Sequence, residues 1–192
     1  RNTMEEIKLL NQKVLRIIQD EDPYNPRKDD NLTKMVCFHN RYDLGDKHNY
    51  NKDDYSSWDE LKKAIEDTEK PVIILPLYLY DHSGITISTT EFSCKWDSGQ
   101  IGFVYITNER INEFGCVMKD EATINDYIKR LTRYIQEEVK QYDQFLQGDI
   151  YGFELIGPDG EEINSCWGFY GSDWKTNGMI DHIHKEDLPD DL

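Results

Sequence analysis

The feature that most constrains the fold is the apolar run Val72–Tyr80, which is interrupted only by Pro76. A run of this length is typical of a strand that lies inside a sheet and is buried on both faces. It is much shorter than the roughly 20 residues that a membrane-spanning helix needs. The sequence therefore predicts a sheet with this strand near its centre and with other elements covering it.

Further segments have the composition of strands, and turn residues separate them. Gly157-Pro158-Asp159-Gly160 is a strong hairpin signal between the last two. The predicted strands are Thr33–Phe38, Thr86–Thr90, Ile101–Thr107, Ile150–Ile156 and Ile163–Phe169.

Four segments carry helical signals. Apolar residues recur at helical spacing over residues 3–19, which predicts an amphipathic N-terminal helix. Ser57 followed by Glu60 resembles a capping box and begins a helix that runs to about Asp67. Asn108 caps a short helix that ends at Gly115, and a long amphipathic helix follows Thr123 and ends at Gly148.

The order of these elements favours an α+β fold, because strands and helices come in groups instead of alternating regularly. We predict a mostly antiparallel sheet of about five to six strands, with the long helix and the N-terminal helix packed on it. A length of 192 residues fits one domain. We therefore expect a single domain over residues 1–192, with an acidic C-terminal tail over residues 172–192.

The charge of the chain is strongly negative, with 38 acidic residues against 22 basic ones and a net charge of -16. This balance excludes direct nucleic-acid binding through phosphate neutralisation and argues against an anionic membrane surface as a partner. Residues 148–192 alone hold eleven acids and two bases, a net charge of -9. Such a field steers basic partners, so the segment can imitate nucleic-acid phosphate; the alternative is a frayed, solvated tail.

Aromatic residues lie among these acids. Carboxylates beside Trp and Tyr suit an arginine-rich protein partner, through ion pairing and cation–π contacts. The predicted partner-binding residues are Tyr170, Asp173, Trp174, Asp181, Glu186 and Asp187.

Cysteine and histidine positions indicate a candidate zinc site. Cys37 and His39 point to the same face of a strand, and His48 follows nine residues later. Thiolate and imidazole ligands suit Zn²⁺, but a tetrahedral site needs four ligands, so Cys94, Cys166 or His82 would have to converge with them. No C-x-x-C pair is present, and the alternative is a buried thiol with two loop histidines.

Motifs for nucleotide chemistry are absent: the sequence has neither a P-loop nor a dinucleotide-binding glycine pattern, and it lacks H-E-x-x-H. The start of the chain carries charges throughout instead of the apolar core of a signal peptide. We therefore expect reduced cysteines and a cytoplasmic location. A metal-dependent or cysteine-dependent enzyme stays open as an alternative, with Cys37, His39, His82, Cys94 and Asp97 as its site.

Three segments carry a resemblance to known proteins: Leu75–Gly84 (LPLYLYDHSG), Cys94–Gln100 (CKWDSGQ) and Ser165–Gly171 (SCWGFYG). With them, the chain from about Asp30 to Gly171 resembles a family of small uncharacterised proteins carried by bacteriophages and mobile elements of Gram-positive bacteria. Small acidic phage proteins of this sort include anti-CRISPR and anti-restriction inhibitors. The resemblance thus implies an inhibitor in the cytoplasm of a bacterial host, and it assigns no catalytic residue.

The leading hypothesis is a non-enzymatic inhibitor that binds a type II CRISPR effector nuclease and blocks DNA loading. Such nucleases hold guide and target in positively charged channels, which an acidic protein can occupy. The alternatives are the phage accessory enzyme above and an inhibitor with a structural zinc. In the last case, removing the metal would lower the melting temperature and inhibition together.

Overall fold

The computed structural model describes residues 3–116 and 123–190 and has an α+β architecture with two antiparallel sheets of four strands each. Its contacts divide the chain into two compact units. The terminal unit comprises Arg1–Asn25 and Gln144–Leu192, and the central unit comprises Pro26–Asp143. The predicted fold class is confirmed, whereas the single sheet of five to six strands is wrong. Independent folding of the two units is a separate question, so the single domain over residues 1–192 stays a prediction.

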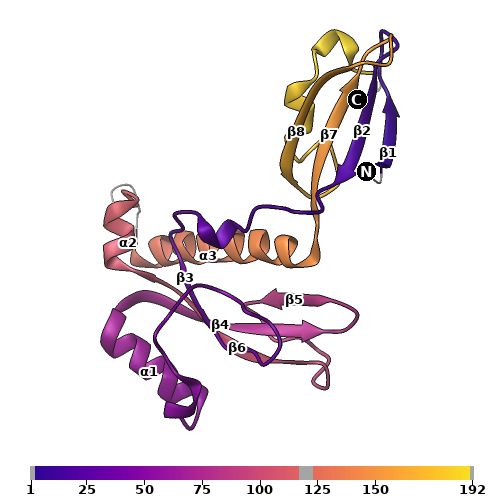
Figure 1. Ribbon diagram of the computed structural model, residues 1–192. Helices are drawn as coiled ribbons and strands as arrows, with labels where there is room; N and C mark the ends of the chain where they lie inside the picture. The colour runs from indigo at the N-terminus through magenta and orange to yellow at the C-terminus, as the bar shows by residue number, and fades with distance from the viewer. Residues whose placement is uncertain (1–2, 117–122, 191–192) are drawn as a thin grey trace. The chain divides into compact units, whose positions relative to one another are not determined.

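The terminal unit is built on the sheet β1-β2-β7-β8. Its strands are β1 (Thr3–Lys8), β2 (Val14–Gln19), β7 (Ile150–Ile156) and β8 (Glu162–Tyr170). Strand β2 pairs with β7, so the two ends of the chain meet in the middle of this sheet. After β8 the chain forms two short 3₁₀ helices, Met179–His182 and Lys185–Asp187, which Figure 1 shows in yellow beside the sheet.

The predicted N-terminal helix over residues 3–19 is wrong, because this segment is the β1–β2 hairpin. Its turn places Asn11 and Gln12 at φ of 56° and 59°, as a type I′ turn requires. Leu15 and Ile17 alternate into the core, whereas Met4 and Leu10, which the helical spacing had included, are 58% and 41% exposed. The spacing of the apolar residues fits the period of a helix as well as that of a strand. The segment forms strands because β2 pairs with β7.

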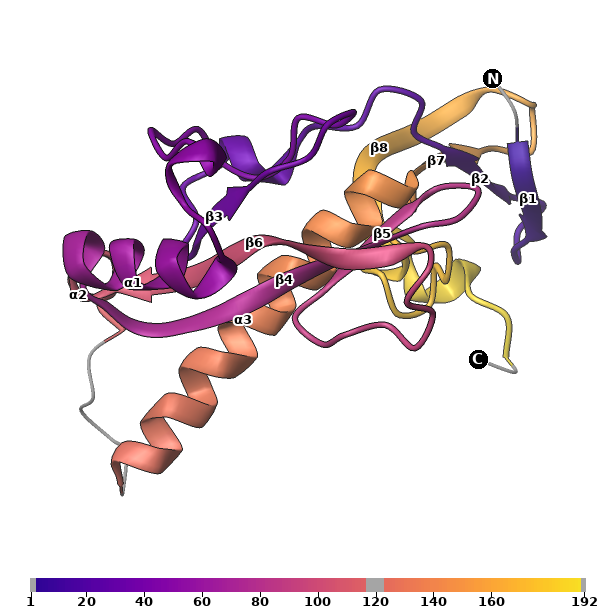
Figure 2. The same ribbon diagram turned by 90° about the horizontal axis from the view of Figure 1, so that it is seen from below.

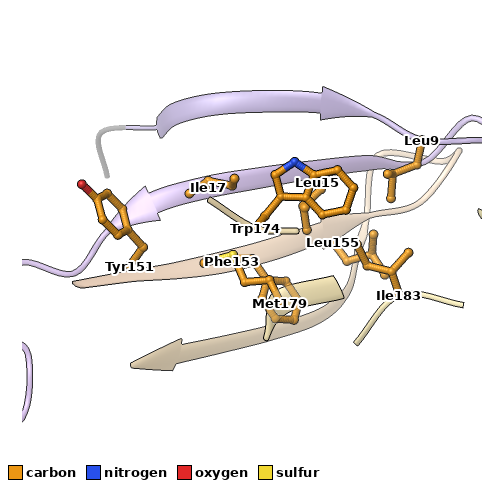
Figure 3. Packing of buried hydrophobic residues seen from close by; sticks show 9 residues of the cluster. All are labelled: Leu9, Leu15, Ile17, Tyr151, Phe153, Leu155, Trp174, Met179 and Ile183. Atoms are coloured by element: carbon orange, nitrogen blue, oxygen red, sulfur yellow. The ribbon is translucent and has the colours of Figure 1, made fainter. Parts of the chain in front are cut away.

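The core of the terminal unit lies between one face of its sheet and the C-terminal segment (Figure 3). Because side chains alternate along a strand, Leu15 and Ile17 of β2 share one face of the sheet with Tyr151, Phe153 and Leu155 of β7. The C-terminal segment supplies Trp174, Met179 and Ile183 to this cluster, and all three are buried. The other members are Leu9, Leu15, Ile17, Tyr151, Phe153 and Leu155.

The central unit is built on the sheet β3-β6-β4-β5. Strand β4 (Pro71–Asp81) lies inside this sheet, between β5 (Ile85–Ser88) and β6 (Ser98–Thr107), as its apolar run predicted. Strand β3 (Lys34–Cys37) pairs with β6 at one edge. Gly102 of β6 faces β3 so closely that a Cβ atom there would stand 1.8 Å from the carbonyl oxygen of Val36.

Helices cover both faces of this sheet: α1 (Trp58–Glu69) lies on one side and α3 (Ile124–Gln147) on the other (Figures 1 and 2). Helix α1 begins as predicted, since the Ser57 hydroxyl accepts the Glu60 N–H and the Glu60 carboxylate accepts the Ser56 N–H. Its residues Leu61 and Ile65 pack on Val36, Phe103 and Tyr105. The short helix α2 (Asn108–Glu113) is capped by Thr107 instead of Asn108. Two single-turn 3₁₀ helices, Pro26–Lys28 and Lys52–Asp54, complete the central unit.

A buried polar cluster joins α3 to the start of β3. The Glu138 carboxylate accepts the backbone N–H groups of Leu32 and Thr33 at 2.9 and 3.0 Å. The guanidinium of Arg27, 3% exposed, forms a two-pronged contact with Asp46 and lies 3.6 Å from Glu138. Charged groups tolerate burial only when they are paired, so this cluster fixes the loop between the 3₁₀ helix Pro26–Lys28 and β3 against α3. Among the described helices, none is long and apolar enough to cross a membrane.

Candidate functional site

The acidic C-terminal segment is anchored to the sheet by one buried carboxylate. Asp187 is fully buried and accepts hydrogen bonds from Lys13 Nζ at 2.7 Å and from Asn11 Nδ2 at 2.8 Å. Its backbone carbonyl also accepts the Leu10 N–H. The hydrogen bonds from Asn11 and Lys13 hold the pKa of Asp187 below its usual value. The described part of the predicted tail, residues 172–190, is thus folded against the β1–β2 hairpin, and residues 191–192 lie outside the described residues.

The six predicted partner-binding residues occupy different environments. Asp173, Asp181 and Glu186 are exposed, and no salt bridge of the described residues includes them. Tyr170 is half-buried at the end of β8. Trp174 is buried because its indole packs in the core, and Asp187 is buried because its carboxylate pairs with Lys13. The three exposed members of the predicted set are therefore all carboxylates, and the same segment also exposes Lys175 and Lys185.

The predicted metal ligands have other contacts in the structure. Cys37 is buried, and burial raises the pKa of its thiol to about 12. His39 Nδ1 accepts the backbone N–H groups of Arg41 and Tyr42, and His48 Nε2 lies 3.1 Å from the Cys37 carbonyl oxygen. Within residues 3–116 and 123–190, no three His, Cys, Asp or Glu side chains are grouped to hold a metal ion.

The remaining two predicted ligands lie in different units. Cys94 lies in the central unit, where its Sγ is 3.9 Å from an oxygen of Asp97. Cys166 lies on β8 of the terminal unit and packs against that unit's core. Nucleophilic cysteines have a cationic neighbour that stabilises the thiolate, whereas the contact of Cys94 is with a carboxylate.

A groove in the central unit brings together two of the three segments that carried the sequence resemblance. Asp81 ends β4, and the loop Cys94–Ser98 leads into β6, so both reach the same end of the sheet. With the loop after β3, they line an open groove of about 980 Å³. The third segment, Ser165–Gly171, lies on β8 in the terminal unit.

Ion pairs and hydrogen bonds tie the walls of this groove together. Arg41 pairs with Asp81, and His82 Nδ1 lies 3.3 Å from Asp97 Oδ2. The Asp81 N–H donates to the Asp97 carbonyl at 2.8 Å, which joins the loop to the end of β4. Trp96 lies on the same loop and is 96% exposed.

The residues named for the alternative enzyme site meet at this groove. Cys37, His39 and Asp97 line it, and His82 and Cys94 each contact Asp97.

The groove as a whole, including Trp96, was not predicted from the sequence. Asp81-His82-Ser83-Gly84 and Trp96-Asp97-Ser98-Gly99 have turn chemistry, and Ser83 and Gly84 do adopt positive φ. One feature of the sequence could have indicated the site: the first of these polar segments follows an apolar strand and the second precedes one, and loops at strand ends often carry functional groups. Their proximity depends on the antiparallel pairing of β4 with β6, which neither segment shows by itself.

Comparison with known proteins adds no relative. The chain matches no protein-family model, and neither curated proteins nor solved structures include a significant match.

Proposed function

We propose that this protein is a non-enzymatic inhibitor of phage or mobile-element origin that binds a basic surface of a host defence nuclease. The most concrete target is a type II CRISPR effector nuclease, whose DNA-loading channel is positively charged. The proposal includes no metal requirement and no catalytic residue of this chain.

The observation that carries the proposal is the folded acidic surface of the terminal unit. Asp173, Asp181 and Glu186 project from a segment whose backbone is held by buried Trp174 and Asp187. A carboxylate on an ordered segment costs less conformational entropy on binding than one on a disordered tail. The negative field of these residues also accelerates the encounter with a basic partner.

The test is co-migration of the full-length protein with a guide-loaded type II nuclease on size exclusion, at low and moderate salt. We expect a complex that weakens as salt rises, because exposed charges are screened beyond about 8 Å at physiological ionic strength. The triple reversal D173K/D181K/E186K should abolish the complex and restore DNA cleavage by the nuclease.

The matched control reverses three exposed acids of the central unit, Asp29, Asp67 and Glu137, which form none of the salt bridges recorded for the described residues. This D29K/D67K/E137K variant has the same net charge as the test variant and should keep the complex. Equal loss in both variants would mean that net charge, not the folded surface, governs binding. A complex insensitive to salt and to both reversals would refute the proposal.

A further inference from the structure

We propose that the groove of the central unit binds an arginine side chain of a basic polypeptide, with the indole of Trp96 as the stacking face. The groove is a second contact surface, separate from the acidic surface of the terminal unit. This inference rests on the proposed function only for the identity of the protein that supplies the arginine.

Trp96 is displayed by a loop whose backbone is fixed on both sides. Before it, Lys95 pairs with Glu91. After it, Ser98 Oγ donates to the Cys94 carbonyl, and the Asp97 carbonyl accepts the Asp81 N–H. The indole itself is 96% exposed at the groove. An ordered loop that leaves its largest apolar side chain in water resembles the tryptophan anchors that dominate protein interfaces.

The charges of the groove select a cation as the ligand. Four aspartates line it, Asp43, Asp53, Asp81 and Asp97, against two cationic residues, Arg41 and Lys52. Arg41 is engaged by Asp81, and Lys52 Nζ lies over the Trp58 ring at 5.4 Å from its centroid.

Asp43 and Asp53 form none of the salt bridges recorded for the described part of the chain, so the groove carries uncompensated negative charge. An anionic ligand is disfavoured there, because it would have to approach these carboxylates.

Arginine fits this combination better than lysine. Its guanidinium is planar, stacks on an indole face and donates two parallel hydrogen bonds to a carboxylate. Trp96 offers the stacking face, and the aspartates that line the groove offer the acceptors. The volume of about 980 Å³ exceeds that of one side chain, so the groove also accepts the flanking backbone of an extended peptide.

The test titrates the full-length protein by calorimetry with a heptapeptide of alternating glycine and arginine. Its counterpart carries citrulline, which has nearly the same shape and no charge. We expect the arginine peptide to bind, with at least tenfold weaker binding for the citrulline peptide and about tenfold weaker binding for Trp96→Ala. Trp96→Phe should retain part of the affinity, and D43N/D53N should lower it. The control Tyr24→Ala removes another exposed aromatic side chain, one outside the groove, and should bind as the wild type does.

Two results overturn the inference: equal affinity for arginine and citrulline peptides, or wild-type affinity in Trp96→Ala. If arginine-peptide binding is lost only in D173K/D181K/E186K, the groove is not the site and the proposed function stands. If the peptide depends on Trp96 while no nuclease complex forms, the groove assignment stands and the proposed function fails.

Discussion

Replacing Asp187 tests how the acidic surface is held in place. Removing one member of a buried ion pair typically costs about 3–5 kcal/mol, because the other charge is left unpaired. Lys13 keeps 19% of its side chain exposed and Asn11 is exposed, so water can solvate both once the carboxylate is gone. We therefore expect Asp187→Ala to lower the free energy of unfolding by about 2–3 kcal/mol. For a chain of this size that corresponds to about 4–12 °C in Tm.

The pH dependence of stability provides a second readout on the same group. The pKa of Asp187 is lowered in the folded state, so its contribution is complete above the ordinary aspartate pKa of about 3.9. It is lost as the pH falls through the lower folded-state pKa. Asp187→Asn keeps an acceptor for Asn11 but has no proton to gain, so its stability should fall less steeply than that of the wild type over this acid range.

The assay is urea unfolding followed by tryptophan fluorescence, together with hydrogen exchange of residues 172–188. Asp187→Ala should lose exchange protection over this segment, whereas D29K/D67K/E137K should keep it. A double-mutant cycle with Lys13→Ala isolates the pair, and we expect a coupling of about 1–3 kcal/mol. Wild-type stability and protection in Asp187→Ala would refute the idea that this carboxylate anchors the segment.

Three further predictions concern the central unit and the two sheets. At pH 8 a thiol reagent should label Cys94 and Cys166 in the native protein but not Cys37, whose pKa is raised to about 12 by burial. Mass spectrometry of the labelled peptides checks this prediction, and labelling of Cys37 in the native protein would contradict it. Gly102→Ala should cost about 3 kcal/mol or more in urea unfolding, because its Cβ would meet backbone atoms of β3. Gly152→Ala should cost less, about 1–2 kcal/mol, because the three atoms nearest to its Cβ belong to the partly exposed Trp167 side chain and not to the backbone. Glu138→Gln should lower the free energy of unfolding by about 2 kcal/mol, because one amide oxygen cannot replace the two carboxylate oxygens that accept the Leu32 and Thr33 N–H groups. An unchanged midpoint of urea unfolding would show that these hydrogen bonds do not stabilise the fold.

Local signals determined much of the secondary structure. The Ser57–Glu60 cap begins α1, the apolar stripe of α3 faces the sheet, and Gly157–Gly160 connects β7 to β8. These elements were predictable because capping, helical periodicity and turn formation each depend on residues a few positions apart. The β1–β2 hairpin was not, since its apolar residues fit a helix equally well and its Asn11-Gln12 turn lacks the usual glycine.

The choice of strands that share a sheet, and of candidate residues that reach the surface, depends on packing between distant segments. Strand β2 pairs with β7, with Val14 opposite Ile156, so the first and last strands of the chain form a sheet of their own. The remaining four strands form the second sheet. The strong acidity of residues 148–192 follows directly from their amino-acid sequence. Packing against β2 and β7 then buried Trp174 and Asp187 and left Asp173, Asp181 and Glu186 exposed. Charge and turn propensity are properties of short segments, whereas burial depends on contacts between residues far apart in the chain.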